Sequence, residues 1–250
     1  MKLTMMRHGE TDRNRLNRVL GRSDLPLNET GLAQADAAGR RLSRTGFDAI
    51  YSSPMKRAYQ TAEGVARYQS HPVPILVKDA LIEQNFGVFE GDKRDDPAYQ
   101  SEKHAFFKPF AGGESMLDVA ARVYHFLDTL AREARLKKQE NILLVTHGGV
   151  CRLIENYFNG MDNEEFASFF MQNCETRTFE FPNPNRDTLQ VLSEEGLFRL
   201  ENEKPALKAE QESLKQRSAY GNPGAEQSVQ KPDHTASNNA QNAQKEEQNA

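Results

Sequence analysis

The feature that most constrains the fold of this chain is an alternation of short apolar runs with longer amphipathic stretches. The run at 141–146, NILLVT, is the clearest predicted strand, and a second apolar run at 2–6 opens the chain. Both stop abruptly at polar residues and glycine, as buried strands do where they lead into a functional loop. By the same criteria, further strands are expected at 47–51, 73–77, 176–181 and 188–192.

Start signals place helices between these strands. Asn28 precedes an alanine-rich stretch with helical spacing that reaches residue 42. Ser53 and Pro54 predict an N-cap and a first helical residue for a helix that ends near residue 68. Ser115, with Asp118 three residues later, predicts a capping box at the start of a helix that extends to about residue 136.

A last helix is expected after the 141–146 strand, so strands and helices alternate along the chain. This order predicts an α/β fold with three layers, α/β/α, around a mostly parallel, doubly wound sheet. Such sheets bind ligands outside the carboxyl ends of their strands. His8 follows the first strand, Arg57 lies just inside the helix after the second, and His147 follows the fourth. We therefore expect these three side chains at one edge of the sheet.

Composition divides the chain into a catalytic domain at 1–200 and a tail at 201–250. The tail is dominated by Gln, Asn, Glu, Lys, Ala and Ser, and Tyr220 is its only aromatic residue. Such a segment cannot bury enough apolar surface to offset its ordering entropy, so it is predicted to be disordered. Within the domain, residues 92–113 lack a clear period and are predicted to form a short insertion, either a loop or a short helix.

Charge and cysteine usage exclude several classes of function. A net charge of −4 gives no basic excess, so neither a nucleic acid nor a membrane surface is an expected partner. Cys151 and Cys174 lack metal-ligand spacing and fit reduced thiols in a cytoplasmic protein. The apolar residues before Arg7 are too few for a signal peptide or a membrane span. The oligomeric state cannot be read from the sequence.

The residues at the predicted strand ends have both bland and chemical interpretations. An arginine and histidine after a strand usually form a surface loop, but Gly9 permits close backbone approach and His8 is a nucleophile. Arg57 alone is more often a solvated helix residue, although the first turn of a helix favours anions. His147 is equally well explained as a satisfied core histidine. Glu83 is a carboxylate where an apolar environment is expected, which is only suggestive.

Taken together, these residues predict a phosphate site that contains a nucleophile. A transferring phosphoryl group needs charge stabilisation, which most enzymes supply partly with Mg²⁺. Two arginines and a second histidine can supply it without metal. The sequence has no concentrated carboxylate or His/Cys cluster, so neither a metal nor a cofactor is expected.

From residue 3 to about residue 181 the sequence resembles the histidine phosphatase superfamily, also called phosphoglycerate mutase-like. Five motifs occur in the family's order: RHGET at 7–11, SSPMKRAYQT at 52–61, LIEQNFGVFEG at 81–91, GGES at 112–115 and VTHGG at 145–149. The resemblance implies that His8 attacks phosphorus and becomes phosphohistidine. Arg7, Arg57 and His147 would hold the equatorial oxygens, and Glu83 would act as general acid and base. The phosphate pocket would be completed by Asn14, Gly21 and Gly148.

The family contains phosphatases and mutases, and three features favour a phosphatase. Only about 20 residues separate Gly91 from Gly112, whereas the mutases resemble one another in a longer insertion. Glu83 is followed by Gln-Asn-Phe where Arg-His-Tyr is expected of a mutase, and His147 by Gly-Gly-Val where Gly-Asn-Ser is expected. We predict a metal-independent phosphomonoester hydrolase for a small phosphorylated metabolite. A phosphoglycerate mutase is the alternative, and a non-catalytic phosphate-binding module is favoured least.

Aromatic residues in and before the insertion have two interpretations. They form either an apolar lid that selects the leaving group or ordinary packing of the insertion onto the domain, and packing is favoured. The residues concerned are Phe86, Phe89, Tyr99, Phe106, Phe107 and Phe110.

Overall fold

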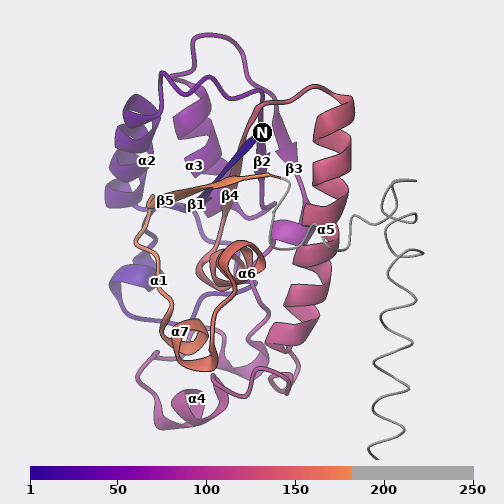
Figure 1. Cartoon of the computed structure of the whole chain (residues 1–250). Coiled ribbons are helices and arrows are strands. Elements are labelled where there is room, and N and C mark those ends of the chain that lie inside the picture. Colours follow the sequence, from indigo (N-terminus) through magenta and orange to yellow (C-terminus); the bar gives the residue numbers. More distant parts are fainter. Residues whose placement is uncertain (182–250) are drawn as a thin grey trace, which may run out of the picture. The chain divides into compact units, whose positions relative to one another are not determined.

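The computed structural model describes residues 1–181. The predicted strand at 188–192, the domain boundary near residue 200 and the tail lie outside the described residues. In the described part, the sheet has the order β3-β2-β4-β1-β5 (Figure 1). Its strands are β1 (Lys2–Arg7), β2 (Ala49–Ser52), β3 (Ile75–Val77), β4 (Asn141–Thr146) and β5 (Thr176–Glu180). The first four run parallel, and β5 is antiparallel to β1.

Helices cover both faces of this sheet. They are α1 (Asp12–Arg15), α2 (Glu29–Arg41), α3 (Lys56–Ala66), α4 (Pro97–Glu102), α5 (Met116–Leu136), α6 (Gly148–Asn159) and α7 (Asn163–Ser168), with short 3₁₀ helices η1 (Asp79–Leu81) and η2 (Gly87–Phe89). Figure 1 shows α2 and α3 on one side of the sheet and α5 on the other. Within the described residues, no helix combines the length and apolar character that a membrane span needs.

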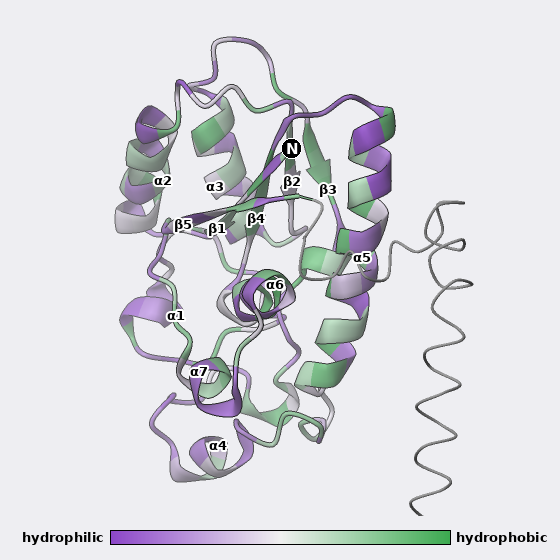
Figure 2. Cartoon of the chain, viewed as in Figure 1, coloured by the Kyte–Doolittle hydropathy of each residue, from purple (hydrophilic) through white to green (hydrophobic). Residues whose placement is uncertain are grey.

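Alternation along β4 explains the two layers of core. Ile142 and Leu144 belong to the hydrophobic cluster formed with α5 and α6, whereas Leu143 and Val145 belong to the cluster formed with α2 and α3. Figure 2 shows hydrophobic residues on β3 and β4 and an alternation of hydrophobic and hydrophilic residues along α5. The predicted three-layer α/β/α fold with a mostly parallel sheet is confirmed.

Most predicted element ends agree with the structure, but three starts do not. The strand predicted at 47–51 begins only at Ala49. Ser115 and Asp118 form the expected capping box of α5. The prediction that Ser53 caps the next helix at Pro54 is wrong: α3 begins at Lys56 and its N-cap, Met55, makes no side-chain cap bond. The predicted strand at 73–77 is shorter because proline, which has no N–H to donate to a ladder, occupies positions 72 and 74.

The insertion is held mainly by aromatic packing. Phe86, Tyr99 and Phe110 are buried with Val19, and Phe89 packs against them. Phe106 packs instead on Phe166 of α7, with ring centroids 5.0 Å apart, and Phe107 is 82% exposed. The packing interpretation therefore accounts for all but one of these rings. Whether they also act as a lid stays a prediction.

Candidate active site

The parallel pairing of β1 with β4 brings two histidines to one edge of the sheet. Arg7 and Thr146 are opposite each other in the register, so the residues that follow them leave the sheet side by side. The rings of His8 and His147 have centroids 5.1 Å apart and an interplanar angle of 59°. Both side chains are buried, with 4% and 0% of their surface exposed.

The hydrogen bonds of His8 determine which ring nitrogen is available. His8 Nδ1 lies 2.6 Å from the carbonyl oxygen of Gly9, which can only accept, so Nδ1 carries the proton. Burial, followed by the charges of Arg57 and Arg7, holds the pKa of His8 well below its usual value of 6.5. The ring is therefore neutral at neutral pH, and its Nε2 keeps an unshared electron pair.

His147 has the opposite tautomer. Its Nδ1 accepts a hydrogen bond of 3.1 Å from Arg57 Nε, which can only donate. The proton of the neutral ring is then on Nε2, which donates to Ser53 Oγ at 2.7 Å. Burial and then the Arg57 charge keep the pKa of His147 well below 6.5. At neutral pH both rings are uncharged.

Arg57 connects His147 to the loop before α2. Its side chain is fully buried, and its Nη1 and Nη2 donate to the carbonyl oxygens of Ser23 and Gly21 at 2.9 and 2.8 Å. Burial lowers the pKa of Arg57 to about 10, so the guanidinium remains charged at neutral pH. The second turn of α3 also supports the site, because Thr61 Oγ1 accepts from the backbone N–H of Gly9 at 3.0 Å.

Arg7 supplies a second buried positive charge. Its Nη1 donates to the carbonyl oxygen of Met171 at 2.5 Å, and its guanidinium lies 5.2 Å from the ring centroid of Phe170. Burial and then the charge of Arg94 lower the pKa of Arg7. Among residues 1–181, Arg7 Nε is buried without a hydrogen-bond partner. This Nε faces the first residue of α6, since a methyl group added at Gly148 would lie 3.9 Å from it.

The Glu83 carboxylate is held at the start of α6. Its Oε2 accepts from the backbone N–H of Gly149 at 3.2 Å, and its Oε1 from that of Gln84 at 2.9 Å. The first turn of a helix has free N–H groups and a positive partial charge, which both favour a carboxylate. Only 5% of the Glu83 surface is exposed. A carboxylate, two guanidinium groups and two neutral imidazoles thus surround this end of the sheet.

The three remaining predicted pocket residues differ in how they are placed. Gly21 and Gly148 lie beside Arg57 and Arg7 as described above. The Asn14 side-chain oxygen accepts instead from the N–H and hydroxyl of Thr11, in the capping box of α1. No hydrogen bond among the described residues links Asn14 to the two histidines or arginines.

The family of the chain follows from a match to a known family model. The model of the histidine phosphatase superfamily (branch 1) matches residues 3–193. The chain belongs to the histidine phosphatase superfamily. The resemblance of the sequence to this family is therefore confirmed.

Some relatives within the superfamily are named as mutases and others as phosphatases. A 2,3-bisphosphoglycerate-dependent phosphoglycerate mutase of Methylobacterium sp. (strain 4-46) is 33% identical over 174 residues, which are 65% of this chain and 82% of the relative. A mycobacterial glucosyl-3-phosphoglycerate phosphatase matches with a TM-score of 0.63 and 26% identity, over 71% of this chain and 88% of that one. The α-ribazole phosphatase from Shigella flexneri matches with a TM-score of 0.62 and 27% identity, over 72% and 90%. Membership of this superfamily supports the prediction that the protein is an enzyme.

Several residues around the histidine phosphatase site were not singled out by sequence. Ser53 contacts His147, although its position suggested a helix cap. Met171 and Phe170 contact Arg7, and Asn173 Nδ2 donates to the carbonyl oxygen of His8 at 2.7 Å. The last three lie in an irregular segment after α7, where neither periodicity nor spacing indicates a role. For Ser53, membership of the SSPMKRAYQT motif was the available signal.

Proposed function

We propose that this protein hydrolyses small phosphomonoesters through a phosphohistidine at His8. The observation that carries the proposal is the unprotonated Nε2 of a neutral His8 at a site with two buried guanidinium groups. An uncharged imidazole is the nucleophilic form, and the arginines attract the phosphoryl oxygens. Glu83, near the same edge of the sheet, supplies a group that can donate and accept a proton.

In the first step, the electron pair of His8 Nε2 forms a bond to phosphorus. The bond from phosphorus to the ester oxygen breaks, and its electron pair leaves on that oxygen. Glu83 in its protonated form donates the proton that makes the leaving group an alcohol. Arg7 and Arg57 stabilise the charge that builds up on the equatorial oxygens, and His147 supports them by accepting from Arg57 Nε and so orienting that guanidinium.

In the second step, water replaces His8 on phosphorus. The Glu83 carboxylate takes one proton from the attacking water as its oxygen bonds to phosphorus. The nitrogen–phosphorus bond breaks, its electron pair returns to Nε2, and inorganic phosphate is released. Glu83 is then protonated again, so both residues are restored for the next cycle.

We propose that this chemistry needs no metal ion, because Arg7 and Arg57 provide two fixed positive charges where a phosphoryl group would bind. Activity that survives EDTA and does not rise with added Mg²⁺ is the expected result.

The proposal also includes a reducing, cytoplasmic location. The two free cysteines are buried, and burial raises the pKa of the Cys174 thiol to about 12 and that of Cys151 further, so both behave as inert core residues.

The phosphatase names of the structural neighbours support hydrolysis, and the Gly-Gly-Val sequence after His147 agrees with them. The mutase names of the sequence relatives support the alternative, a phosphoglycerate mutase. The two functions differ in what happens to the phosphoryl group after it reaches His8. A hydrolase gives it to water, whereas a mutase returns it to another hydroxyl of the substrate.

The test is rapid quenching of the protein with a ³²P-labelled phosphomonoester. Alkali-stable, acid-labile label is expected on wild type and none on His8→Gln, with His71→Gln as a control at an exposed histidine. Steady turnover by unlabelled wild-type protein would rule the proposal out. Incubation with 3-phosphoglycerate and a trace of 2,3-bisphosphoglycerate distinguishes the alternative. Phosphate release supports the hydrolase, and isomerisation without release supports the mutase.

A further inference from the structure

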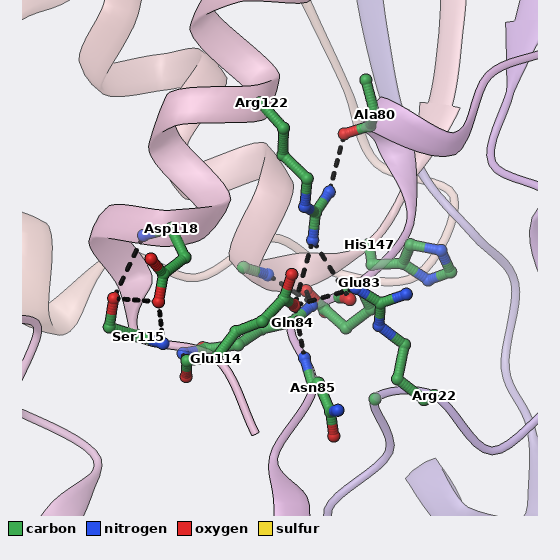
Figure 3. Close-up of polar contacts among 12 residues, drawn as sticks. Arg22, Ala80, Glu83, Gln84, Asn85, Glu114, Ser115, Asp118, Arg122 and His147 are labelled. Atoms are coloured by element: carbon green, nitrogen blue, oxygen red, sulfur yellow. Dashed lines mark hydrogen bonds and ion pairs between the residues drawn. The ribbon is translucent and has the colours of Figure 1, made fainter. Parts of the chain in front are cut away.

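The GGES motif contains a carboxylate, Glu114, to which the mechanism above assigns no role. Its Oε2 accepts from the backbone N–H of Asn85 at 2.9 Å and from Arg22 Nη2 at 2.9 Å. Arg122 Nη2 lies 3.5 Å from the same oxygen (Figure 3). Glu114 thus joins three segments: the one that follows Glu83, the loop before α2, and α5.

Arg122 reaches from α5 to the backbone that carries Glu83, as Figure 3 shows. Its Nη1 donates to the carbonyl oxygen of Ala80 at 2.7 Å, and its Nη2 to that of Glu83 at 3.3 Å. One planar guanidinium therefore holds two points of the chain three residues apart. The side chain of Gln84 adds a further bond, from Nε2 to the carbonyl oxygen of Glu114 at 2.9 Å.

Arg22 connects the same carboxylate to the opposite side of the site. Its neighbours Gly21 and Ser23 provide the two carbonyl oxygens that hold Arg57. The two segments are also in direct contact, since a methyl group added at Gly21 would lie 2.2 Å from the carbonyl oxygen of Gln84. Glu114 therefore lies where the backbone of Glu83 meets the loop that fixes Arg57.

The charge of Glu114 is maintained by its partners. Burial of the carboxyl opposes ionisation, but the Asn85 N–H, Arg22 and Arg122 together hold the pKa of Glu114 below its ordinary value. At neutral pH one carboxylate thus lies between two guanidinium groups. Among the described residues, the Nε atoms of Arg22 and Arg122 are buried without hydrogen-bond partners, so both guanidinium groups are held through their Nη atoms.

We propose that Glu114 and Arg122 are positioning residues that fix the backbone of Glu83, and through it the carboxyl group that serves the leaving oxygen. Neither residue touches the reacting atoms. The inference rests on the proposed function, in which Glu83 is the general acid and base. It differs from a purely structural role in one respect: loss of the network must weaken proton transfer more than it weakens phosphoryl transfer.

Leaving groups separate these two effects. An alkyl phosphate releases a strongly basic oxygen that needs the proton from Glu83, whereas 4-nitrophenyl phosphate releases a weakly basic oxygen that hardly needs it. For Glu114→Gln and Arg122→Lys, we expect kcat/KM on the alkyl phosphate to fall about 10- to 100-fold, as a small misplacement of a catalytic group does. On the aryl ester we expect a loss of about 3-fold or less, mainly in kcat, because neither variant removes the bonds of Arg57 to the carbonyl oxygens of Gly21 and Ser23.

Two reference variants are needed to interpret the ratio of kcat/KM on the alkyl phosphate to kcat/KM on 4-nitrophenyl phosphate. Glu83→Gln should show the same selective loss to a greater degree, because it removes the proton donor itself. Glu155 is another buried carboxylate that takes no part in this network, and it pairs with Arg177 at an N···O distance of 3.2 Å. Glu155→Gln should leave the ratio of kcat/KM on the alkyl phosphate to kcat/KM on the aryl ester unchanged. Circular dichroism shows whether each variant is folded.

Equal losses on both substrates, or no loss on either, would overturn the positioning role. If Glu114→Gln does not fold, Arg122→Lys decides by the same ratio, since it keeps the charge but cannot hold both carbonyl oxygens in one plane. Failure of the proposed function looks different. In that case wild type forms no phosphohistidine, or Glu83→Gln itself fails to distinguish the two leaving groups.

Discussion

Glycine at position 149 leaves room for the Glu83 carboxylate at the start of α6. A methyl group added there would lie 2.7 Å from Glu83 Oε1, closer than carbon and oxygen can approach. The obstructed atom is the far end of a flexible side chain, so the backbone of α6 need not move. A change at this residue therefore reaches the candidate acid and base without disturbing the core.

Gly149→Ala is accordingly expected to reduce activity much more than stability. The added methyl group displaces the Glu83 carboxyl, which we expect to lower kcat for an alkyl phosphate about 10-fold or more. Alanine also favours the helix, so the free energy of unfolding should change by less than about 1 kcal/mol. Steady-state kinetics and urea denaturation measure the two effects.

A double-mutant cycle is the control for this prediction. If the methyl group acts by displacing Glu83, then Glu83→Gln should cost much less in the Gly149→Ala background than in wild type, because the two changes affect the same proton transfer. Losses that simply multiply would show that Gly149→Ala acts by another route.

At the scale of elements, the end of β4 positions both sides of the site. Thr146, its last residue, is fully buried, and its Oγ1 donates to the carbonyl oxygen of Leu81 at 2.7 Å. Leu81 is the last residue of η1, two positions before Glu83. The same strand end leads directly into His147. One hydroxyl therefore connects the strand that carries His147 to the short helix that precedes Glu83.

Thr146→Val removes this hydroxyl while conserving the shape of the side chain. It leaves the buried carbonyl oxygen of Leu81 without its partner, which we expect to lower the free energy of unfolding by about 1–3 kcal/mol. Thr45→Val, the same change at an exposed position after α2, should alter it by about 0.5 kcal/mol or less. Urea denaturation of the two variants tests this, and equal effects would show that the hydrogen bond contributes nothing.

Elements whose signals are local were predictable from the sequence. The apolar run at 141–146 has the length and flanking residues of a buried strand, and Ser115 with Asp118 is a complete capping signal by itself. Ser53 shows where such reasoning fails. Its position before Pro54 gives the same local signal, but its hydroxyl is bonded to His147, which lies 94 residues away in the chain. A tertiary partner of that kind leaves no trace in local spacing.

In the candidate site, too, the residues with local sequence signals were predictable and the residues that make only tertiary contacts were not. The histidines and arginines lie at the ends of strands or in the first turn of a helix, so the rule for parallel sheets places them at one edge. The contacts that orient them come from elsewhere. Arg7 depends on Phe170 and Met171, whose irregular segment after α7 has neither a hydrophobic period nor a cap signal to indicate that it returns to the sheet.

At the scale of the whole molecule, two uncharged histidines make stability depend on pH. His8 and His147 have pKa values well below 6.5 because they are buried and face Arg57 and Arg7. The unfolded chain takes up protons at these residues as the pH falls through about 6.5, whereas the folded chain does not. Their contribution to stability is therefore complete above this pH and is lost as the pH falls toward their folded-state values.

Carboxylates with lowered pKa values change the stability of the fold in a different, more acidic pH range. Glu114 and Asp118 stabilise the folded state above their unfolded pKa values, and this stabilisation is lost only at lower pH, below about 4. The interval between about pH 7 and pH 5 therefore reports mainly on buried histidines. His104 is exposed, and its pKa is lowered by slight desolvation and then by Lys103, so it adds a smaller contribution of the same sign.

We therefore expect the free energy of unfolding to fall as the pH is lowered from about 7 to about 5, with each buried histidine contributing up to about 1.4 kcal/mol per pH unit. His8→Asn and His147→Asn should each flatten this dependence, because asparagine does not titrate. Urea denaturation at intervals across the range measures the slope, with His71→Asn as the control at an exposed position. A slope that is the same in wild type and in both variants would mean that the histidines are not kept neutral by the fold. The nucleophilic state of His8 would then need another source, since the same burial that produces the slope leaves Nε2 unprotonated.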